Sequence, residues 1–280
     1  MGVPFVVPIV LMWVFEGFGW CLFKCFVVVF CGGCVYFWLL GWVYLVVCGG
    51  AVGLHIPDGF LSLPWVVVTY VVAVVYGVVA VSRIRRVWGP GRAAVVTVLA
   101  AAVFAAQMLN WPLPGGTSLH FVGGGLAGIL LGPWLGFMVL ALVLVVQCLV
   151  FHDGGITALG ANIVNMGIVA VVVGYYVFRL STRVLGSGRL GRLVGGFLGG
   201  WLSITLAGVA CGVEIGLSPQ FPYGVGVTVP IMGFWHALLG VVEGVVTAFV
   251  VDYVYERASS FVVVREIEVE TVSGGGAGHG

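Results

Sequence analysis

Long stretches of apolar residues without charge constrain this chain more than any other feature. The run at 64–81 holds no charged residue, and several runs approach or exceed the roughly 18 residues expected of a membrane-spanning helix. The runs are continuously apolar rather than alternating, which favours helices over the strands of an outer-membrane barrel. Only 8% of the residues are charged, whereas soluble domains carry about a quarter. The sequence therefore predicts an all-α integral membrane protein.

Seven core spans are predicted from residue 54 onward, forming one transmembrane domain over 54–252. The third and fourth spans are separated at Gly132–Pro133, because proline interrupts a helix. Residues 253–280 alternate charge with valine and then become glycine-rich, which is typical of a flexible tail. The predicted spans lie at about 64–81, 93–109, 119–132, 134–151, 160–178, 193–213 and 227–251.

The placement of arginine predicts how the bundle is oriented. Loops that carry arginine follow the first and fifth spans, and the tail follows the seventh, so all three share one side of the membrane. The positive-inside rule makes that side cytoplasmic. We therefore expect a multi-pass protein of the cell membrane, in contact with lipid, with a cytoplasmic C-terminus. The four loops expected to face outward hold neither Lys nor Arg; they are 54–63, 110–118, 152–158 and 215–226.

Residues 1–53 differ from the rest in being rich in Phe, Trp, Val and Cys. Two hydrophobic helices are predicted here, at about 5–30 and 34–52. Three interpretations stay open for this extension: two additional spans, a long export signal that ends at 51–53, or untranslated sequence ahead of a leucine initiator codon. The C-x-x-C pair at Cys31 and Cys34 lies in apolar surroundings, which favours a packing role for these thiols.

Histidines in or beside the outward-facing loops indicate a metal site. His55, His120 and His152 lie at that face, and His236 lies about nine residues into the last predicted span. Imidazole suits nickel, cobalt, copper and zinc. The alternative is that each histidine forms a hydrogen bond at the membrane interface. His120 is expected in the first turn of a helix capped by Thr117 or Ser118, where the helix dipole favours a neutral ring.

Three carboxylates near these histidines are candidates for supporting roles. Asp58 is predicted to close a local Asx-type turn, and Asp153 to bond the loop backbone or line an entry path. Glu243 lies seven residues after His236 on the same helix face. It is predicted either to orient that imidazole or to fix helix packing through a hydrogen bond. Glycine pairs such as Gly195–Gly196 predict close helix contacts.

The sequence shows no pattern that indicates catalysis. It contains no phosphate-binding G-x-x-x-x-G-K-[ST] loop, so we expect that the protein is not an enzyme. A transporter of this kind that uses ATP must rely on a partner subunit to hydrolyse it. The net charge of +1 makes nucleic acid an unexpected partner.

A set of short motifs resembles the substrate-binding membrane subunit of energy-coupling factor cobalt and nickel transporters, the CbiM/NikM type. The resemblance covers about 54–252, and the motifs are specific only in combination. They read LHIPDGFL at 54–61, PGGTSLH at 114–120, LGPW at 131–134, DGG at 153–155, LGANIVNMG at 159–167 and HALLGVVEG at 236–244.

The resemblance implies a set of metal ligands. In that family the metal is bound by the amine of the first residue, the amide and ring of the second, and the histidine of the Gly-Thr-Ser-x-His element. These positions correspond to Leu54, His55 and His120. Three nitrogens from one amino terminus with a fourth beside them suit the planar field that Ni(II) prefers. The amine ligand requires Leu54 to be the first residue of the mature chain, whereas here 53 residues precede it.

The resemblance also implies what the protein does and with which partners. Co(II) or Ni(II) is the transported substrate, captured outside the cell for uptake and for purposes such as cobalamin synthesis, and no organic cofactor is expected. The expected partners are a transmembrane coupling subunit, cytoplasmic ATPase subunits and a small accessory membrane subunit. Two alternatives stay open: a stand-alone metal channel or permease, and a membrane scaffold that transports nothing. Cobalt and nickel accept the same nitrogen ligands, so the sequence predicts either metal.

Overall fold

The computed structural model describes residues 55–85, 88–113, 115–258 and 262, together with the backbone of four strands between residues 8 and 46. By its contacts the chain divides into two compact units, Met1–Val52 and Gly53–Gly280. The first unit carries one antiparallel sheet, and the second carries the membrane helices.

The first unit is a sheet where helices were predicted. Its strands pair in the order β1-β2-β3-β4, so the helices predicted at about 5–30 and 34–52 are wrong over the strand residues. Valine and aromatic residues dominate these segments, and such side chains favour extended backbone as readily as an apolar helix. The remainder of both ranges lies outside the described residues. The strands are β1 (Pro8–Leu11), β2 (Phe26–Cys31), β3 (Cys34–Leu39) and β4 (Trp42–Val46).

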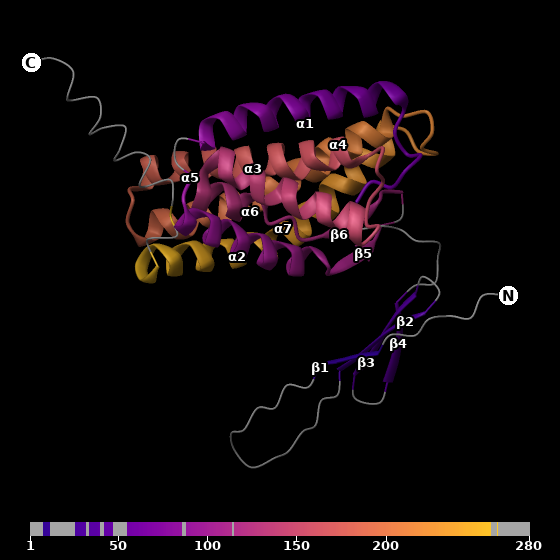
Figure 1. Ribbon diagram of the computed structural model, residues 1–280, viewed down its shortest axis with the longest axis horizontal. Coiled ribbons are helices and arrows are strands. Elements are labelled where there is room, and N and C mark those ends of the chain that lie inside the picture. The colour runs from indigo at the N-terminus through magenta and orange to yellow at the C-terminus, as the bar shows by residue number, and fades with distance from the viewer. Residues whose placement is uncertain are drawn as a thin grey trace, which may run out of the picture. The chain divides into compact units, whose positions relative to one another are not determined.

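The second unit is a bundle of helices, which confirms the predicted all-α membrane fold (Figure 1). Among the described residues, six helices are long and apolar enough to cross a membrane. The fourth of these, Leu159–Leu185, contains one stretch of wider π-helix between two α-helical parts. The elements are α1 (Leu63–Ile84), α2 (Pro90–Gln107), α3 (Gly124–Val150), α4 (Leu159–Asn162), the π-helix η1 (Ile163–Val169), α5 (Ala170–Leu185), α6 (Arg189–Gly216) and α7 (Val225–Arg257).

The predicted count of seven spanning helices is wrong, because the third predicted span is only partly helical. Helix α3 has one non-helical residue, Gly132, with φ 79° and ψ 176°, at the predicted break. The helical part before it, 124–131, rises only about 12 Å at 1.5 Å per residue. A Cβ added to Gly136 would lie 3.0 Å from the carbonyl of Ala127, so the two parts of α3 fold back on each other.

Glycines let the helices approach closely, as predicted. A Cβ added to Gly196 of α6 would lie 2.8 Å from the Cα of Ala248 in α7, and one added to Gly174 of α5 would lie 2.4 Å from the Cα of Gly125 in α3. Small residues allow this backbone approach in membrane bundles, where association depends on packing rather than on exclusion of water.

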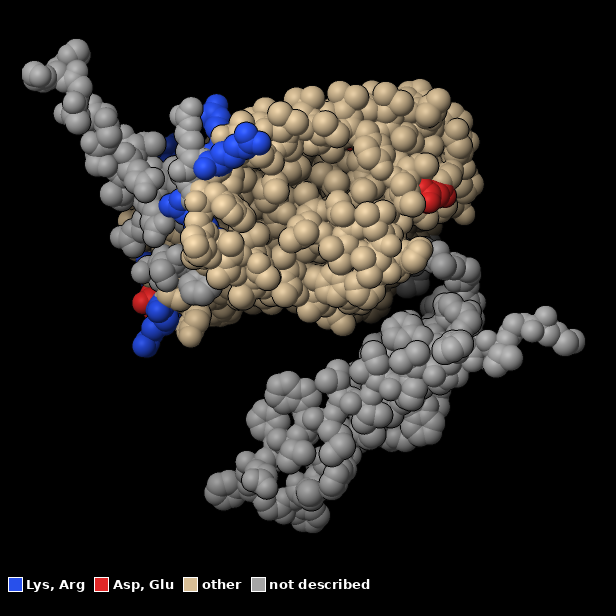
Figure 2. Space-filling view, in the orientation of Figure 1, with Lys and Arg blue, Asp and Glu red and all other residues tan. Residues whose placement is uncertain are grey.

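On the visible surface of the bundle, charged side chains lie at the two ends. In the face shown in Figure 2, the blue Lys and Arg side chains gather at one end, and the tan surface between the ends carries no charge. Figure 1 shows α4 and the strands β5 (Asn110–Pro112) and β6 (Ser118–His120) at the opposite end. An uncharged belt between two polar ends is what a lipid bilayer requires.

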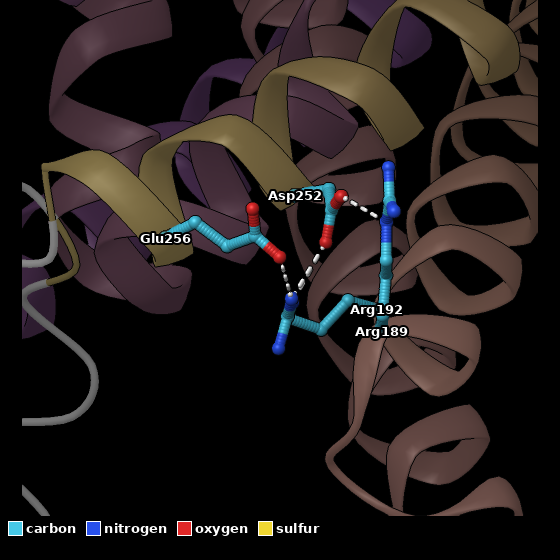
Figure 3. A network of polar contacts seen from close by, with 4 residues as sticks. All are labelled: Arg189, Arg192, Asp252 and Glu256. Atoms are coloured by element: carbon cyan, nitrogen blue, oxygen red, sulfur yellow. Dashed lines mark hydrogen bonds and ion pairs between the residues drawn. The ribbon is translucent and has the colours of Figure 1, made fainter.

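An ion-pair network joins the charged ends of α6 and α7 (Figure 3). The guanidinium of Arg192 donates to Asp252 over 2.7 and 3.0 Å and to Glu256 over 2.9 Å. Arg189 donates to the other oxygen of Asp252 over 3.1 Å. Helix α7 continues to Arg257, so Glu256 lies in helix, whereas the sequence predicts a flexible tail from residue 253.

Candidate metal site

A short hairpin, not a helix, carries His120. Strands β5 and β6 pair antiparallel, with Asn110 opposite His120, and the turn between them closes with a bond from the Leu113 N–H to the Thr117 carbonyl. Helix α3 begins only at Gly124. The prediction that His120 lies in the first turn of a helix is therefore wrong, because the backbone at 118–120 pairs with β5 instead. Ser118 is buried in the same strand.

The segment that carries His55 is held by backbone hydrogen bonds to the loop and helix at 154–162. The N–H of Ile56 donates to the side-chain oxygen of Asn162 over 3.1 Å, and the N–H of Gly155 donates to the Ile56 carbonyl over 2.9 Å. Gly154 has φ +87°, and a Cβ there would lie 2.8 Å from the Cβ of His55. Glycine is thus required both for this backbone conformation and for room beside the imidazole.

Asp58 connects two distant loops instead of closing the predicted local turn. Its carboxylate accepts from the Thr157 N–H over 2.7 Å and from the Thr157 hydroxyl. The bond from the Thr157 hydroxyl is the main cause that lowers the pKa of Asp58 below its ordinary value, and burial opposes it. The carboxylate therefore fastens the His55 segment while it is ionised.

This link predicts a dependence of stability on acid. A carboxyl whose pKa is lower in the folded protein stabilises the fold above its unfolded pKa, and this contribution is lost as pH falls below about 4. We expect the Asp58→Asn and Thr157→Val variants to lose less thermal stability than the wild type between about pH 6 and about pH 3.5. Thermal unfolding of the detergent-solubilised proteins checks this, and variants with the same acid dependence as the wild type would contradict it.

Two buried imidazoles lie against each other at this end of the bundle. The side chains of His55 and His120 belong to residues that are 3% and 5% exposed, and their ring centroids are 5.0 Å apart in an edge-on arrangement. Among the described residues, neither ring nitrogen of His55 has a hydrogen-bond partner. Its Nδ1 lies 3.5 Å from a carboxylate oxygen of Asp153. The predicted ligand Leu54 lies outside the described residues.

A cavity of about 30 Å³ opens beside these rings and reaches into the bundle, with His55, His120 and His236 in its wall. The Nδ1 of His120 lies 2.7 Å from the Phe121 carbonyl, and the Nδ1 of His236 lies 2.7 Å from the Met232 carbonyl. A carbonyl fixes the proton on Nδ1 and leaves Nε2 as the nitrogen able to bind a metal. A space of this size holds one or two atoms as large as a water oxygen. Further residues of its wall are Thr117, Ser118, Asn162, Asn165, Cys211 and Met232.

Four of the predicted residues that the structure describes are not part of the cavity wall: Asp58, His152, Asp153 and Glu243. His152 is exposed and is absent from the cavity wall. Glu243 does not orient His236, because both of its carboxylate oxygens accept backbone N–H groups, those of Val122 and Gly123, over 2.8 Å. The sequence placed Glu243 and His236 on one helix face but gave no sign of this more distant backbone partner.

The roles of Asn162 and Gln107 are not predicted from the sequence. Asn162 belongs to one of the motifs, and its side chain both accepts from and donates to the backbone of Ile56. Gln107 ends α2 and donates to the Val122 carbonyl over 2.8 Å. The one signal available is that both are polar residues next to long apolar runs.

The bundle and its cavity define a multi-pass membrane protein with a small internal pocket lined by imidazole. Residues 55–261 match the family model of CbiM, the cobalt uptake substrate-specific transmembrane region. The chain belongs to this family of membrane components for cobalt and nickel uptake, as the motifs predict.

Relatives and a solved structure agree with this assignment. A protein of Archaeoglobus fulgidus, provisionally named the fused nickel transport protein NikMN, is 53% identical over 201 residues, which cover 72% of this chain and 65% of that protein. The cobalt transport protein CbiM of Sorangium cellulosum is 34% identical over 215 residues, or 73% of this chain and 92% of that one. The crystal structure of a truncated transition-metal transporter matches with a TM-score of 0.68 and 36% identity, over 72% of this chain and 98% of that one.

Proposed function

We propose that this chain is the substrate-specificity subunit of an ATP-driven importer, and that it captures Co(II) or Ni(II) at the outer face of the membrane. The proposed ligands are the amine of Leu54, the amide and ring of His55, and the ring of His120. One observation carries the proposal: within the described part of the chain the buried His55 imidazole has no hydrogen-bond partner on either nitrogen, and a second imidazole lies beside it.

Burial without a hydrogen bond makes the His55 ring costly unless something binds it. A buried polar group left unsatisfied costs about 1–3 kcal/mol, and such groups in native proteins call for an explanation such as an ion. Metal–imidazole bonds are about 2.0–2.1 Å long for zinc, so two rings at 5.0 Å are close enough for one ion of similar size. The chelate closes through Nδ1 of His55, so the Asp153 carboxylate near this nitrogen is suited to attract the cation.

In the described part of the chain, side chains alone do not supply all the ligands that a metal ion requires. Within it, no group of three or more His, Cys, Asp or Glu side chains is arranged to hold a metal. Backbone nitrogens at the start of the mature chain would supply the two missing ligands, and this set is planar and nitrogen-only, which favours Ni(II) and related ions over Mg or Ca.

The outward position of the site is supported by the distribution of charge. Basic residues of the described segments lie at the end of the bundle opposite to β5, β6 and α4 (Figures 1 and 2). The positive-inside rule assigns the basic end to the cytoplasm. The pocket then opens toward the outside, and the C-terminus lies inside. The residues concerned include Arg83, Arg85, Arg92, Arg189, Arg192 and Arg257.

The proposed partners are a transmembrane coupling subunit, ATPase subunits and a small accessory membrane subunit. The chain has no phosphate-binding loop of its own, so energy from ATP must come from elsewhere. The A. fulgidus relative carries the word fused in its name, and the matched region spans 65% of its length. This supports an accessory component in the proposed assembly.

Metal uptake by cells tests the proposal. We expect radioactive nickel or cobalt to accumulate when the chain is co-expressed with its coupling and ATPase subunits, and not when the ATPase carries an inactivating substitution. Uptake by the chain alone, independent of ATP, would favour a stand-alone permease. Absence of metal binding by the purified protein would favour a scaffold. Uptake with and without competing metal also separates cobalt from nickel.

A further inference from the structure

A buried clamp holds the peptide between His120 and the start of α3. The N–H groups of Val122 and Gly123 each donate to one oxygen of Glu243 over 2.8 Å. The carbonyl of Val122 accepts from the side chain of Gln107 over 2.8 Å. Glu243 lies on α7 and Gln107 ends α2, so side chains of two different helices hold both sides of one peptide.

The clamp lies deep in the bundle. Glu243 is 18 residues after the first residue of α7 (243 − 225), or about 27 Å along the helix. Gln107 is fully buried and Glu243 is 4% exposed. Backbone that is neither helix nor sheet is tolerated at membrane depth only where its polar groups are satisfied inside the protein. These two side chains satisfy both N–H groups and one carbonyl of Val122 and Gly123, which lie between β6 and α3.

The clamped residues are continuous with a proposed metal ligand. Val122 is two residues after His120, and the Nδ1 of His120 lies 2.7 Å from the carbonyl of the residue between them. Gly123 has φ +70°, a conformation that non-glycine residues rarely adopt. The ring of His120 is thus joined by three successive residues to an anchor on α7, the helix that also places His236 in the cavity wall.

We propose that Glu243, assisted by Gln107, is a positioning residue for metal binding: it fixes the 121–123 peptide and thereby holds the Nε2 of His120 toward the ion. This inference rests on the proposed function, because it assigns His120 to the metal. Glu243 does not touch the ion. Its effect passes through the backbone of the clamped peptide, and α7 is then the element whose displacement would release His120 during transport.

The test compares three variants of the protein purified from membranes with its native amino terminus, using Ni(II) as the probe. Glu243→Gln replaces one acceptor oxygen by a donor that faces a backbone N–H, and Gln107→Met removes the donor to the carbonyl. The control is Thr228→Val, which removes a buried 2.6 Å bond from α7 to the Gly212 carbonyl and leaves the clamp intact.

We expect Glu243→Gln to raise the Kd for Ni(II) about 10-fold or more, as loss of an orienting partner does in other metal sites. The absorption bands of bound Ni(II) should shift, because His120 no longer completes the planar set. Gln107→Met should also raise the Kd for Ni(II) and shift the absorption bands. The control Thr228→Val should lower thermal stability with little change in Kd or spectrum.

A folded Glu243→Gln protein with the wild-type Kd and spectrum would overturn the inference. So would a Thr228→Val protein that binds as weakly as Glu243→Gln, since the effect would then be general loss of packing. Gln107→Met decides the question if Glu243→Gln does not fold. Failure of the proposed function itself would show differently, as a wild-type protein that does not bind the metal.

Discussion

Replacing His55 by alanine is expected to weaken the binding of Ni(II) and Co(II) by more than about 100-fold. Loss of a partner that only orients a ligand costs about 10- to 100-fold in metal affinity, and the His55 ring is proposed to bind the ion directly. The ring is almost fully buried beside His120, so solvent does not readily replace it. Titration calorimetry on the purified protein measures the loss.

The matched control is His152→Ala. His152 lies in the loop that follows α3, next to Asp153, is exposed, and is not part of the cavity wall. We expect its removal to leave the Kd within about two-fold of the wild type, as for most surface substitutions. Equal losses in the two variants would show that binding depends on the histidines at this end of the bundle in general and not on the His55–His120 pair.

Retention of residues 1–53 is expected to weaken Ni(II) binding as strongly as the loss of the His55 ring. An amide nitrogen inside a peptide bond cannot act as the free amine that the proposed planar set requires, so a chain that starts at Met1 lacks one of four ligands. We expect a form whose first residue is residue 54 to bind Ni(II) more than about 100-fold more tightly than the full chain, by comparison with the smaller effect of lost orienting groups.

Two forms expressed separately measure this difference. The first begins at residue 54 and the second carries the complete sequence, and both are titrated with Ni(II) under the same conditions. A His55→Ala version of each shows how much binding comes from this site. Equal Ni(II) affinities in the two forms would exclude the amine as a ligand. Amino-terminal sequencing of the protein from its native membrane then shows which form the cell contains.

The membrane helices could be predicted well from the sequence because each apolar run can be recognised by itself. The predicted spans at 193–213 and 227–251 lie within helices that the structure extends to Arg189–Gly216 and Val225–Arg257. Lipid demands a continuous apolar run with internal backbone bonds, and such a run is visible without knowledge of its neighbours. The break at Gly132 could also be predicted from local sequence, because a proline follows this glycine.

The supporting contacts of the site could not be predicted, because their partners are far apart in the chain. Ile56 and Asn162 are 106 residues apart, and Glu243 and Val122 are 121 residues apart. The pattern of His236 and Glu243 suggested either a local pair or a hydrogen bond that fixes packing. The carboxylate forms hydrogen bonds of the second kind, to backbone groups that no periodicity reveals. His120 was expected on a helix because its turn and Ser/Thr residues are typical of a helix start, and pairing with Asn110 determined the outcome instead.

X-ray absorption at the nickel edge of the Ni(II)-loaded protein tests the central claim most directly, since it reports the atoms bound to the ion. The account predicts a first shell made only of nitrogen, with the outer-shell scattering of two imidazole rings, one of which disappears in His55→Ala and the other in His120→Ala. A shell dominated by oxygen or sulfur, or imidazole scattering that persists unchanged in both variants, would contradict the assignment of this pair as the metal site.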